Sequence, residues 1–294
     1  MKIKKLFLQC DIFGKTQNFT IAKKKSYRTY FGSFISLGII GILTYLIFYF
    51  GLEIFFRRKP NVIITTYNDE NPPETLIDDS KNIFALALEN PDYNVYINDS
   101  IYTLNASIVK LSLGETGYTT HKEPITLMRC SEYKFKFLNE YFSPLDLSNL
   151  YCLNTTTPYM IKGEFSKSEW IYLKFQFNKC VNSTENHNSC MPQEEIDSRL
   201  KGGYLGMFIS QTTVTPTNFK EPFSSFGKNV FTSFTATQYT DVWMYLKPLI
   251  LETDDGYIFL RNKTERCLVY DSHFTTYDYR SGTTFLSLNL GYLF

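Results

Sequence analysis

The longest uninterrupted run of apolar residues lies near the start of the chain and predicts a membrane-spanning helix. From Phe34 to Leu52 there are nineteen residues without a charge. About twenty mostly apolar residues are needed to cross a hydrocarbon core roughly 30 Å thick. A cleavable secretory signal fits less well, because its apolar region covers only about 7–15 residues and lies nearer the N-terminus. We therefore expect a retained signal-anchor, a single N-terminal transmembrane α-helix over residues 33–56.

Further along the chain, the dominant pattern is alternation of apolar and polar residues. It occurs over residues 101–113 and 170–178 and again at the end, in Leu286, Leu288, Leu290 and Tyr292. A period of two is typical of half-buried strands in antiparallel sheets. Many short strands with few helices predict a β-rich, sandwich-like α+β ectodomain over residues 83–294.

Local signals add a hairpin and two helical turns. Asp254-Asp255-Gly256 lies between Leu249–Leu251 and Tyr257–Leu260, which predicts a hairpin because glycine adopts positive φ readily. Pro192 and the acidic residues that follow it predict a helix, which a glycine at 202 or 203 would end and which Ile196 and Leu200 would anchor. A shorter helical turn is expected over Leu145–Leu150, after Pro144.

Charge is distributed unevenly, which indicates how the helix is oriented. The first 59 residues hold eleven basic and two acidic residues and carry +9, whereas the remainder carries −8. Five basic residues precede the helix from residue 15 onward and three follow it, which favours a cytoplasmic N-terminus. A mitochondrial presequence, and hence the mitochondrial inner membrane, is the alternative, but this start is rich in lysine rather than arginine and serine.

These features divide the chain into four parts. Residues 1–32 are a basic cytoplasmic segment whose lysines and aromatic residues suit a surface of anionic lipid. Residues 33–56 are the helix, and residues 57–82 are a stalk, because Asn71-Pro72-Pro73 and several acids disfavour a packed element. Residues 83–294 form the extracellular or lumenal domain.

Six cysteines are present, of which Cys10 would be cytoplasmic and a free thiol. The five others are Cys130, Cys152, Cys180, Cys190 and Cys267. Two bridges among five cysteines can be arranged in fifteen ways. We expect Cys130–Cys152 and Cys180–Cys190, because each pair brackets a loop between predicted elements. Cys267 would then be unpaired or joined to another chain.

A metal site built from Cys180, His187 and Cys190 is the alternative to the second bridge. The spacing matches no strong zinc pattern, and secreted domains favour disulfides. We therefore expect no metal and no cofactor.

Five N-glycosylation sequons lie in the predicted ectodomain, at Asn98, Asn105, Asn154, Asn182 and Asn262. A chain of this composition holds several sequons by chance, so position carries more weight than number. Asn105 lies on the polar side of its predicted strand, and Asn154 and Asn182 lie in loops beside cysteines. A sixth sequon, at Asn18, lies on the cytoplasmic side and is discarded.

No set of catalytic residues is apparent. After the helix there are three histidines, His121, His187 and His273, each in a polar context. G-x-S-x-G, H-E-x-x-H, Walker and G-x-G-x-x-G motifs are absent. Asp254 and Asp255 suit a turn better than a catalytic pair. The prediction is a protein that is not an enzyme.

Tyrosine and phenylalanine number 22 and 26. Exposed aromatic side chains could serve sugar binding or self-association. Filling of a β-domain core is the favoured interpretation.

The chain resembles a group of uncharacterised ciliate membrane proteins in a series of short motifs. These are Asp11-Ile-Phe-Gly, Tyr27-Arg-Thr-Tyr-Phe-Gly-Ser, Ile97-Asn-Asp-Ser-Ile-Tyr, Cys130, Asn149-Leu-Tyr-Cys152, Trp170 to Cys180, and Ser189-Cys-Met-Pro-Gln-Glu-Glu-Ile196. The resemblance implies a surface or organelle membrane and a shared ectodomain fold. Members often continue to a second membrane helix, whereas this chain ends at Phe294 within an alternating apolar stretch.

These observations favour a membrane-anchored surface glycoprotein with a structural or protein-interaction role, in the plasma or ciliary membrane. Its expected partners are the lipid bilayer, N-glycans and other surface proteins, with homo-oligomers included and nucleic acid excluded. Two alternatives stay open. One is a subunit of a two-helix trimeric ion channel, which would need a second helix, and the other is a surface receptor.

Overall fold

A computed structural model describes most of the chain. The described residues are 16–21, 24–26, 29–56, 61–66, 74–77, 82–115, 117–154, 156, 158–163, 167–182, 190–218, 220–254, 256, 261–280 and 282–292; for 16–26 and 53–56 they comprise the backbone only. The chain divides into two compact units, the first holding Met1–Ile63 and Gly256–Leu260 and the second Ile64–Asp255 and Arg261–Phe294.

The first unit contains the predicted apolar helix, α2 (Tyr30–Phe56). It begins three residues before the predicted start, because the Thr29 hydroxyl accepts a hydrogen bond from the Gly32 N–H over 2.9 Å and caps the first turn. Tyr30–Leu52 is long and apolar enough to cross a membrane, and only 6% of its most apolar window is buried within the protein. Before it, β1 (Thr16–Ile21) and β2 (Lys24–Ser26) form an antiparallel pair inside the segment predicted to be basic and cytoplasmic.

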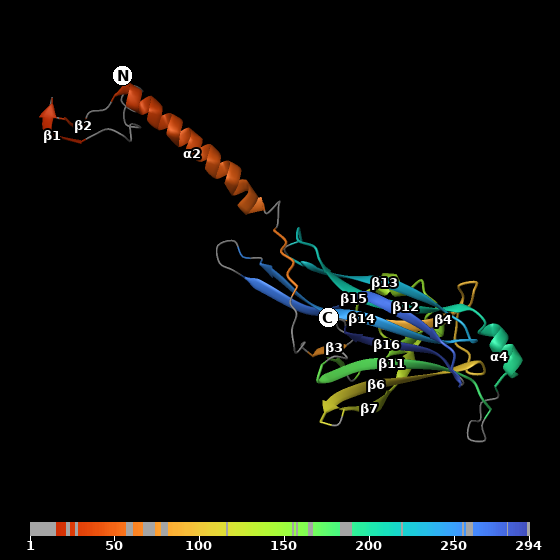
Figure 1. Ribbon diagram of the computed structural model, residues 1–294. Coiled ribbons are helices and arrows are strands. Elements are labelled where there is room, and N and C mark those ends of the chain that lie inside the picture. Colours follow the sequence, from red (N-terminus) through yellow and green to blue (C-terminus); the bar gives the residue numbers. More distant parts are fainter. Residues whose placement is uncertain are drawn as a thin grey trace. The chain divides into compact units, whose positions relative to one another are not determined.

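The second unit is a β-rich, sandwich-like domain with two large sheets (Figure 1). We name them sheet 1, with strand order β15-β14-β16-β11-β6-β7, and sheet 2, with order β13-β12-β4-β9-β8 and β5 beside β4. The strands of sheet 1 are β6 (Tyr102–Gly114), β7 (Gly117–Ile125), β11 (Glu169–Lys179), β14 (Tyr239–Asp254), β15 (Asn262–Asp278) and β16 (Thr284–Tyr292). Those of sheet 2 are β4 (Phe84–Glu89), β5 (Val95–Tyr96), β8 (Leu127–Arg129), β9 (Tyr151–Leu153), β12 (Gly203–Val214) and β13 (Phe223–Phe234).

The strands predicted from alternation are present as β6, β11 and β16. In β11 the side chains of Leu173, Phe175 and Phe177 are fully buried, as the alternation predicts. Tyr172, assigned to the polar face, is also buried, at 8% exposed, because that face carries a small cluster of aromatic side chains. The expectation of one polar face is therefore too simple for this strand.

One strand pair in sheet 1 is parallel, which differs from the predicted antiparallel arrangement. β14 and β15 form a hairpin, and β16 then pairs with the other side of β14 in parallel. The hairpin predicted around Asp254 exists, with Asp254 opposite Asn262. Its second strand begins at Asn262, and the predicted strand residues 257–260 lie outside the described residues.

The main core lies between the two sheets and consists of aliphatic and aromatic side chains. Phe84 of β4 stacks on Phe175 of β11 with ring centroids 5.6 Å apart, which joins the centre of sheet 2 to the centre of sheet 1. Burial of apolar surface contributes roughly 25 cal/mol per Å² and is the main force holding such sheets face to face.

A second, smaller core covers the outer face of sheet 2. The segment from Cys130 to Leu150 packs there and includes η1 (Cys130–Glu132), α3 (Asn139–Phe142) and η2 (Leu147–Asn149). We name it the covering segment. The helical turn predicted at residues 145–150 is the 3-10 turn η2, whereas α3 is an element that the sequence pattern did not predict.

The predicted stalk differs from the structure at its C-terminal end. Within residues 57–82, β3 (Thr75–Ile77) pairs with β10 (Tyr159–Ile161), and the Ile77 side chain is 2% exposed within the main core. The folded domain therefore includes residues placed in the linker. The Asn71-Pro72-Pro73 signal itself lies outside the described residues, and it did not predict the strand Thr75–Ile77 that follows.

The predicted helix is α4 (Gln193–Arg199), with Pro192 as its N-cap. Ile196 and Leu200 are both 0% exposed, as expected. The helix ends before the two glycines, with Leu200 as its C-cap, and β12 starts at Gly203.

Candidate functional site

Two cysteine pairs lie at disulfide distance, in the pairing that the sequence suggested. The sulfur atoms of Cys130 and Cys152 are 2.09 Å apart, and those of Cys180 and Cys190 are 1.96 Å apart. The first pair fastens the start of the covering segment to β9. The second pair joins the end of β11 to the residues before α4. The short distance between the two sulfur atoms of the alternative metal site disfavours that alternative, and its third proposed ligand, His187, lies outside the described residues.

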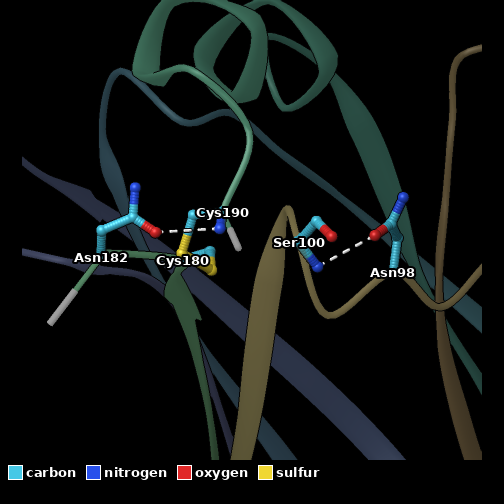
Figure 2. Close-up of a disulfide and its surroundings, with 5 residues drawn as sticks. All are labelled: Asn98, Ser100, Cys180, Asn182 and Cys190. Carbon is cyan, nitrogen blue, oxygen red and sulfur yellow. Dashed lines mark hydrogen bonds between the residues drawn. A yellow bond between two sulfur atoms is a disulfide. The ribbon is translucent and has the colours of Figure 1, made fainter. Parts of the chain in front are cut away.

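The Cys180–Cys190 disulfide lies beside two of the predicted sequons (Figure 2). The Asn182 Oδ1 atom accepts a hydrogen bond from the Cys190 N–H over 2.9 Å, and Asn98 Oδ1 accepts one from the Ser100 N–H over 3.0 Å. A backbone bond from the Met191 N–H to the Ser100 carbonyl, 3.0 Å long, joins the two loops. Sequons distant in the sequence therefore lie at one end of the domain.

The other sequons occupy separate places on the domain. Asn105 is exposed on β6, and Asn262 is exposed at the start of β15. Asn154 is half-buried after β9, where its Oδ1 accepts a hydrogen bond from the Thr156 hydroxyl over 3.0 Å. Addition of a glycan needs an accessible side-chain nitrogen in a surface position, a condition that the exposed Asn105, Asn182 and Asn262 meet best.

Cys267 belongs to neither disulfide and is buried. Its side chain is 1% exposed on β15, and its Sγ donates a weak hydrogen bond to the Leu249 carbonyl over 3.8 Å. A bridge to another chain would require this part of the sheet to open. Burial therefore weighs against the intermolecular alternative for Cys267. Cys10 lies outside the described residues.

The two histidines that the structure describes lie far apart in their sheet, and His187 lies outside the described residues. His121 lies on β7 and His273 on β15, which are opposite edges of sheet 1. The Asp254 carboxylate accepts a hydrogen bond from the Arg261 N–H over 2.9 Å, which is a turn contact. Within the described part of the chain, no group of three or more His, Cys, Asp or Glu side chains is arranged to hold a metal ion.

Many of the largest aromatic side chains fill the cores, as the favoured interpretation predicted. Tyr102, Tyr292, Phe142, Phe175 and Phe177 are among the largest fully buried side chains. Partly buried aromatic residues pack against the main core and also against the smaller clusters on the outer faces of the two sheets.

A groove of about 340 Å³ lies on the outer face of sheet 2, between the covering segment, the β4–β5 turn and the strands β12 and β13. Its volume is at the lower end of the range for small-molecule sites, about 300–1,000 Å³. Two side chains in its lining are acidic, and none is basic. The lining consists of Glu89, Tyr93, Val95, Pro144, Leu145, Asp146, Leu150, Phe208, Asn229 and Phe231.

Glu89 reaches the groove because of the register of β4. Alternate side chains of this strand, Phe84, Leu86 and Leu88, belong to the main core. Ala85 and Ala87 belong to the second core on the outer face, and Glu89 continues that side of the strand. Only 5% of the Glu89 residue is exposed. Burial raises its pKa above the ordinary glutamate value.

A glycine makes room for this carboxylate. A Cβ atom at Gly206 would lie 2.7 Å from Glu89 Oε1, 3.2 Å from the Phe231 ring and 3.3 Å from the Phe208 ring. Gly206 is opposite Ala87 on one side and Phe231 on the other. Two small residues side by side thus leave a space between aromatic rings, and Glu89 occupies it.

The rim of the groove is held by local hydrogen bonds. Asn90 Oδ1 accepts the N–H groups of Asp92 and Asn94, at 3.0 and 2.9 Å, and this turn places Tyr93 at φ 62°. A side chain with a Cβ adopts this left-handed conformation rarely. The Tyr93 ring stacks on Tyr204, which is opposite Glu89 in the β4–β12 register, with centroids 5.2 Å apart.

The covering segment supplies the opposite wall. Tyr141 of α3 donates a hydrogen bond to Asn229 Oδ1 and lies over Gly227, where no side chain obstructs it. Asp146 accepts hydrogen bonds from the side chains of Asn149 and Ser148, and these bonds lower the pKa of its carboxyl. The wall is therefore fixed by polar contacts and by the Cys130–Cys152 disulfide.

Sequence reasoning did not identify this groove. Glu89 ends an apolar run, Phe84–Glu89, that has the composition of an ordinary buried strand. The residues that surround its carboxylate come from positions 93–95, 144–150 and 206–231. The one local signal is a glutamate placed where the alternation calls for a residue on a covered face.

Comparison with known proteins identifies a family for most of the folded domain. The family described as "Uncharacterised 80 kDa protein N-terminal domain" matches residues 83–291. This span starts just before β4 and ends within β16. No curated protein and no solved structure matches the chain.

Proposed function

The chain belongs to the family of the uncharacterised 80 kDa protein N-terminal domain, and from this premise we propose that it is a membrane-anchored surface glycoprotein with a structural or protein-interaction role. Its N-terminus would lie in the cytoplasm, and its β-rich domain outside the plasma or ciliary membrane. The domain would assemble with neighbouring surface proteins or with further copies of this chain.

The observation that carries the proposal is the combination of α2 with a disulfide-linked domain. The apolar surface of α2 is left almost uncovered by the protein itself, which supports a lipid environment. Disulfides persist in oxidising compartments, so two cysteine pairs at bonding distance support a domain outside the cytosol. The basic residues that precede the helix support the cytoplasmic N-terminus.

The interaction role is supported by the domain surface. The groove on sheet 2 lies between elements that hydrogen bonds and a disulfide hold in place. Within the described residues, no group of His, Cys, Asp or Glu side chains is arranged to hold a metal ion. A rigid, extracellular domain with a small recessed site suits recognition of a neighbour.

Orientation can be tested with the sequons themselves. We would express the full-length chain in eukaryotic cells and follow its mobility after N-glycosidase treatment, with membranes washed in alkaline carbonate. The protein should remain with the membrane and lose mass on deglycosylation. Substitution of Asn105, Asn182 or Asn262 by Gln should remove glycans one at a time.

Asn18→Gln is the matched control, because Asn18 is the sequon on the opposite side of the helix. It should leave the glycosylation unchanged. If only Asn18→Gln removed all glycan, the N-terminus would lie outside the cytosol, which is the opposite of the proposed topology. Release of the protein from the membrane by carbonate would contradict the proposed transmembrane anchor.

Assembly is tested by the native mass of the protein in mild detergent, with and without reductant. The proposal expects assemblies larger than one chain, and the burial of Cys267 predicts that reductant leaves their mass unchanged. A monomer under all conditions would contradict a role in assembly through this chain.

A further inference from the structure

The Glu89 carboxylate lacks the partners that a buried charge ordinarily has. Within the described part of the chain, no hydrogen bond or ion pair reaches it, although only 5% of the residue is exposed and it lines the groove. Buried polar groups are nearly always hydrogen-bonded, and buried charges are paired, because removal from water is costly. A carboxylate in this state calls for hydrogen-bond donors from outside the domain.

The surroundings of Glu89 define what kind of donor fits. The groove contains a second carboxylate, from Asp146, and no lysine or arginine in its lining. The rings of Phe208 and Phe231 lie close to the carboxylate at the space left by Gly206. Apolar walls and aromatic rings favour the alkyl part and the charge of an organic cation.

A cation that also donates hydrogen bonds fits better than one that does not. The two oxygen atoms of Glu89 need donors, and a charge-assisted hydrogen bond is roughly twice as strong as a neutral one. A primary ammonium has three donors and a guanidinium has five. A quaternary ammonium has none and would leave the carboxylate without hydrogen bonds.

We propose that this groove binds the cationic end of a lysine or arginine side chain carried by a partner protein, with Glu89 as its ion-pair partner. The side chain would enter between Tyr93 and the covering segment, its alkyl stem against Leu145 and Leu150. This inference rests on the proposed interaction role for the source of the cation. It deepens that role by giving the chemistry of the partner.

The backbone at the groove agrees with a built site. Only two described residues other than glycine have positive φ, Tyr93 and Leu138. Tyr93 lines the groove, and Leu138 precedes α3, whose Tyr141 fixes the lining residue Asn229. Unfavourable backbone conformations persist where the surrounding structure holds them and gather at binding sites. Both of these border the same face of sheet 2.

The test is a calorimetric titration of the full-length protein in detergent with small blocked amino acids. The probes are N-acetyl-lysine-N-methylamide and N-acetyl-arginine-N-methylamide. N-acetyl-norleucine-N-methylamide has a similar length without the charge, and choline has the charge without N–H donors. The two blocked basic amino acids should bind more tightly than either control compound.

Three variants locate the binding. Glu89→Gln keeps the shape and removes the charge, and it should weaken binding of the lysine compound by about tenfold or more. Gly206→Ala places a Cβ 2.7 Å from Glu89 Oε1 and should weaken it as well. Glu252→Gln, at an exposed position on β14 of the other sheet, should leave the affinity within about twofold.

The proposal is overturned by equal binding of the norleucine compound, by unchanged affinity in Glu89→Gln, or by binding of choline alone. The proposal is also overturned if none of the four compounds binds. If Gly206→Ala does not fold, Glu89→Gln still tests the proposal, because glutamine has nearly the same size and shape as glutamate. The titration is made on the monomer fraction in detergent and does not depend on membrane orientation, whereas the proposed function is tested by glycosylation and native mass, so the two can fail separately.

Discussion

Two carboxylates on the outer faces of the two sheets lie beside aromatic rings, yet their surroundings differ. Asp241, on β14 of sheet 1, accepts hydrogen bonds from Trp243 Nε1 over 3.1 Å, from Asn289 Nδ2 over 2.8 Å and from the Tyr239 hydroxyl over 3.3 Å. Glu89, on β4 of sheet 2, is buried and receives none from the described residues. One charge is held within the fold, and the other is left for a partner.

The neighbouring aromatic groups differ in the same way. On sheet 1, Trp170 stacks on Trp243 with centroids 5.1 Å apart, and Tyr172 lies 5.2 Å from Trp243. These rings pack on one another. On sheet 2, Phe208 and Phe231 instead border an open space beside Glu89. The comparison teaches that a carboxylate that accepts hydrogen bonds from its neighbours marks a structural cluster, whereas one without such bonds marks a candidate site.

The largest expected effect comes from breaking the link that holds the covering segment on sheet 2. Cys130→Ser should lower the free energy of unfolding by about 2–5 kcal/mol, the usual cost of losing a native disulfide. Urea denaturation of the full chain in detergent measures this. Both tryptophans of the chain lie on sheet 1. Their fluorescence at zero urea should therefore stay native if the damage is confined to sheet 2. An unchanged unfolding midpoint would contradict the role given to this bridge.

Removal of the charge at Asp241 should have the next largest effect. Asp241→Asn weakens three hydrogen bonds to a carboxylate and should cost roughly 1–3 kcal/mol of unfolding free energy. The Trp243 emission should shift, because its Nε1 donates to this group. A variant as stable as the natural chain would mean that Asp241 is not the structural carboxylate that the comparison requires.

Removal of the charge at Glu89 should act in the opposite direction. Burial raises the pKa of Glu89 in the folded state above its value in the unfolded chain. The stability contributed by its proton is therefore present below the ordinary glutamate pKa and is lost as pH rises through the raised value. Glu89→Gln resembles the protonated form at every pH, so it should gain about 1 kcal/mol at neutral pH.

The pH dependence of that gain is the sharper check. It should disappear below the ordinary glutamate pKa, because both proteins are then uncharged at this position. A variant that is less stable than the natural chain at neutral pH would show that the Glu89 carboxylate is already satisfied, and the contrast with Asp241 would fail.

The smallest change in the free energy of unfolding is expected for an exposed carboxylate. Glu195 on α4 pairs with Arg199 one turn away over 3.0 Å, with about half of each side chain exposed. Glu195→Gln should change the free energy of unfolding by no more than about 0.5 kcal/mol. A larger loss would mean that surface charges influence this domain more than the comparison assumes.

The sequence predicted the elements whose residues follow one period. The apolar run gives α2, the alternation gives β6, β11 and β16, and Pro192 with Ile196 and Leu200 gives α4. The Cys180–Cys190 pairing followed from a short loop between recognisable elements. In each case the deciding information lies within a few residues of the element itself.

The features that the sequence did not predict depend on contacts between distant segments. The parallel pair β14–β16 arises because β16 pairs beside β14 after the β15 hairpin, and β3 joins the domain through β10. The site at Glu89 needs Gly206 opposite Ala87 and a covering segment fixed by Cys130. No local pattern at Glu89 specifies these neighbours, so its burial without a partner becomes visible only in the fold.

The most direct test of this account is the titration of the Glu89 carboxyl, followed by ¹³C NMR in full-length protein labelled at glutamate, with Glu89→Gln to assign the signal. Four other titratable groups lie around Glu89 or on the walls of its groove, namely Tyr93, Tyr204, Tyr141 and Asp146. The hydrogen bond with Tyr93 raises the pKa of Tyr204, burial raises that of Tyr141 to about 12, and the Asn149 amide lowers that of Asp146. The account predicts that Glu89 titrates above the ordinary glutamate range and that N-acetyl-lysine-N-methylamide lowers its pKa. An ordinary pKa that the compound leaves unchanged would contradict it.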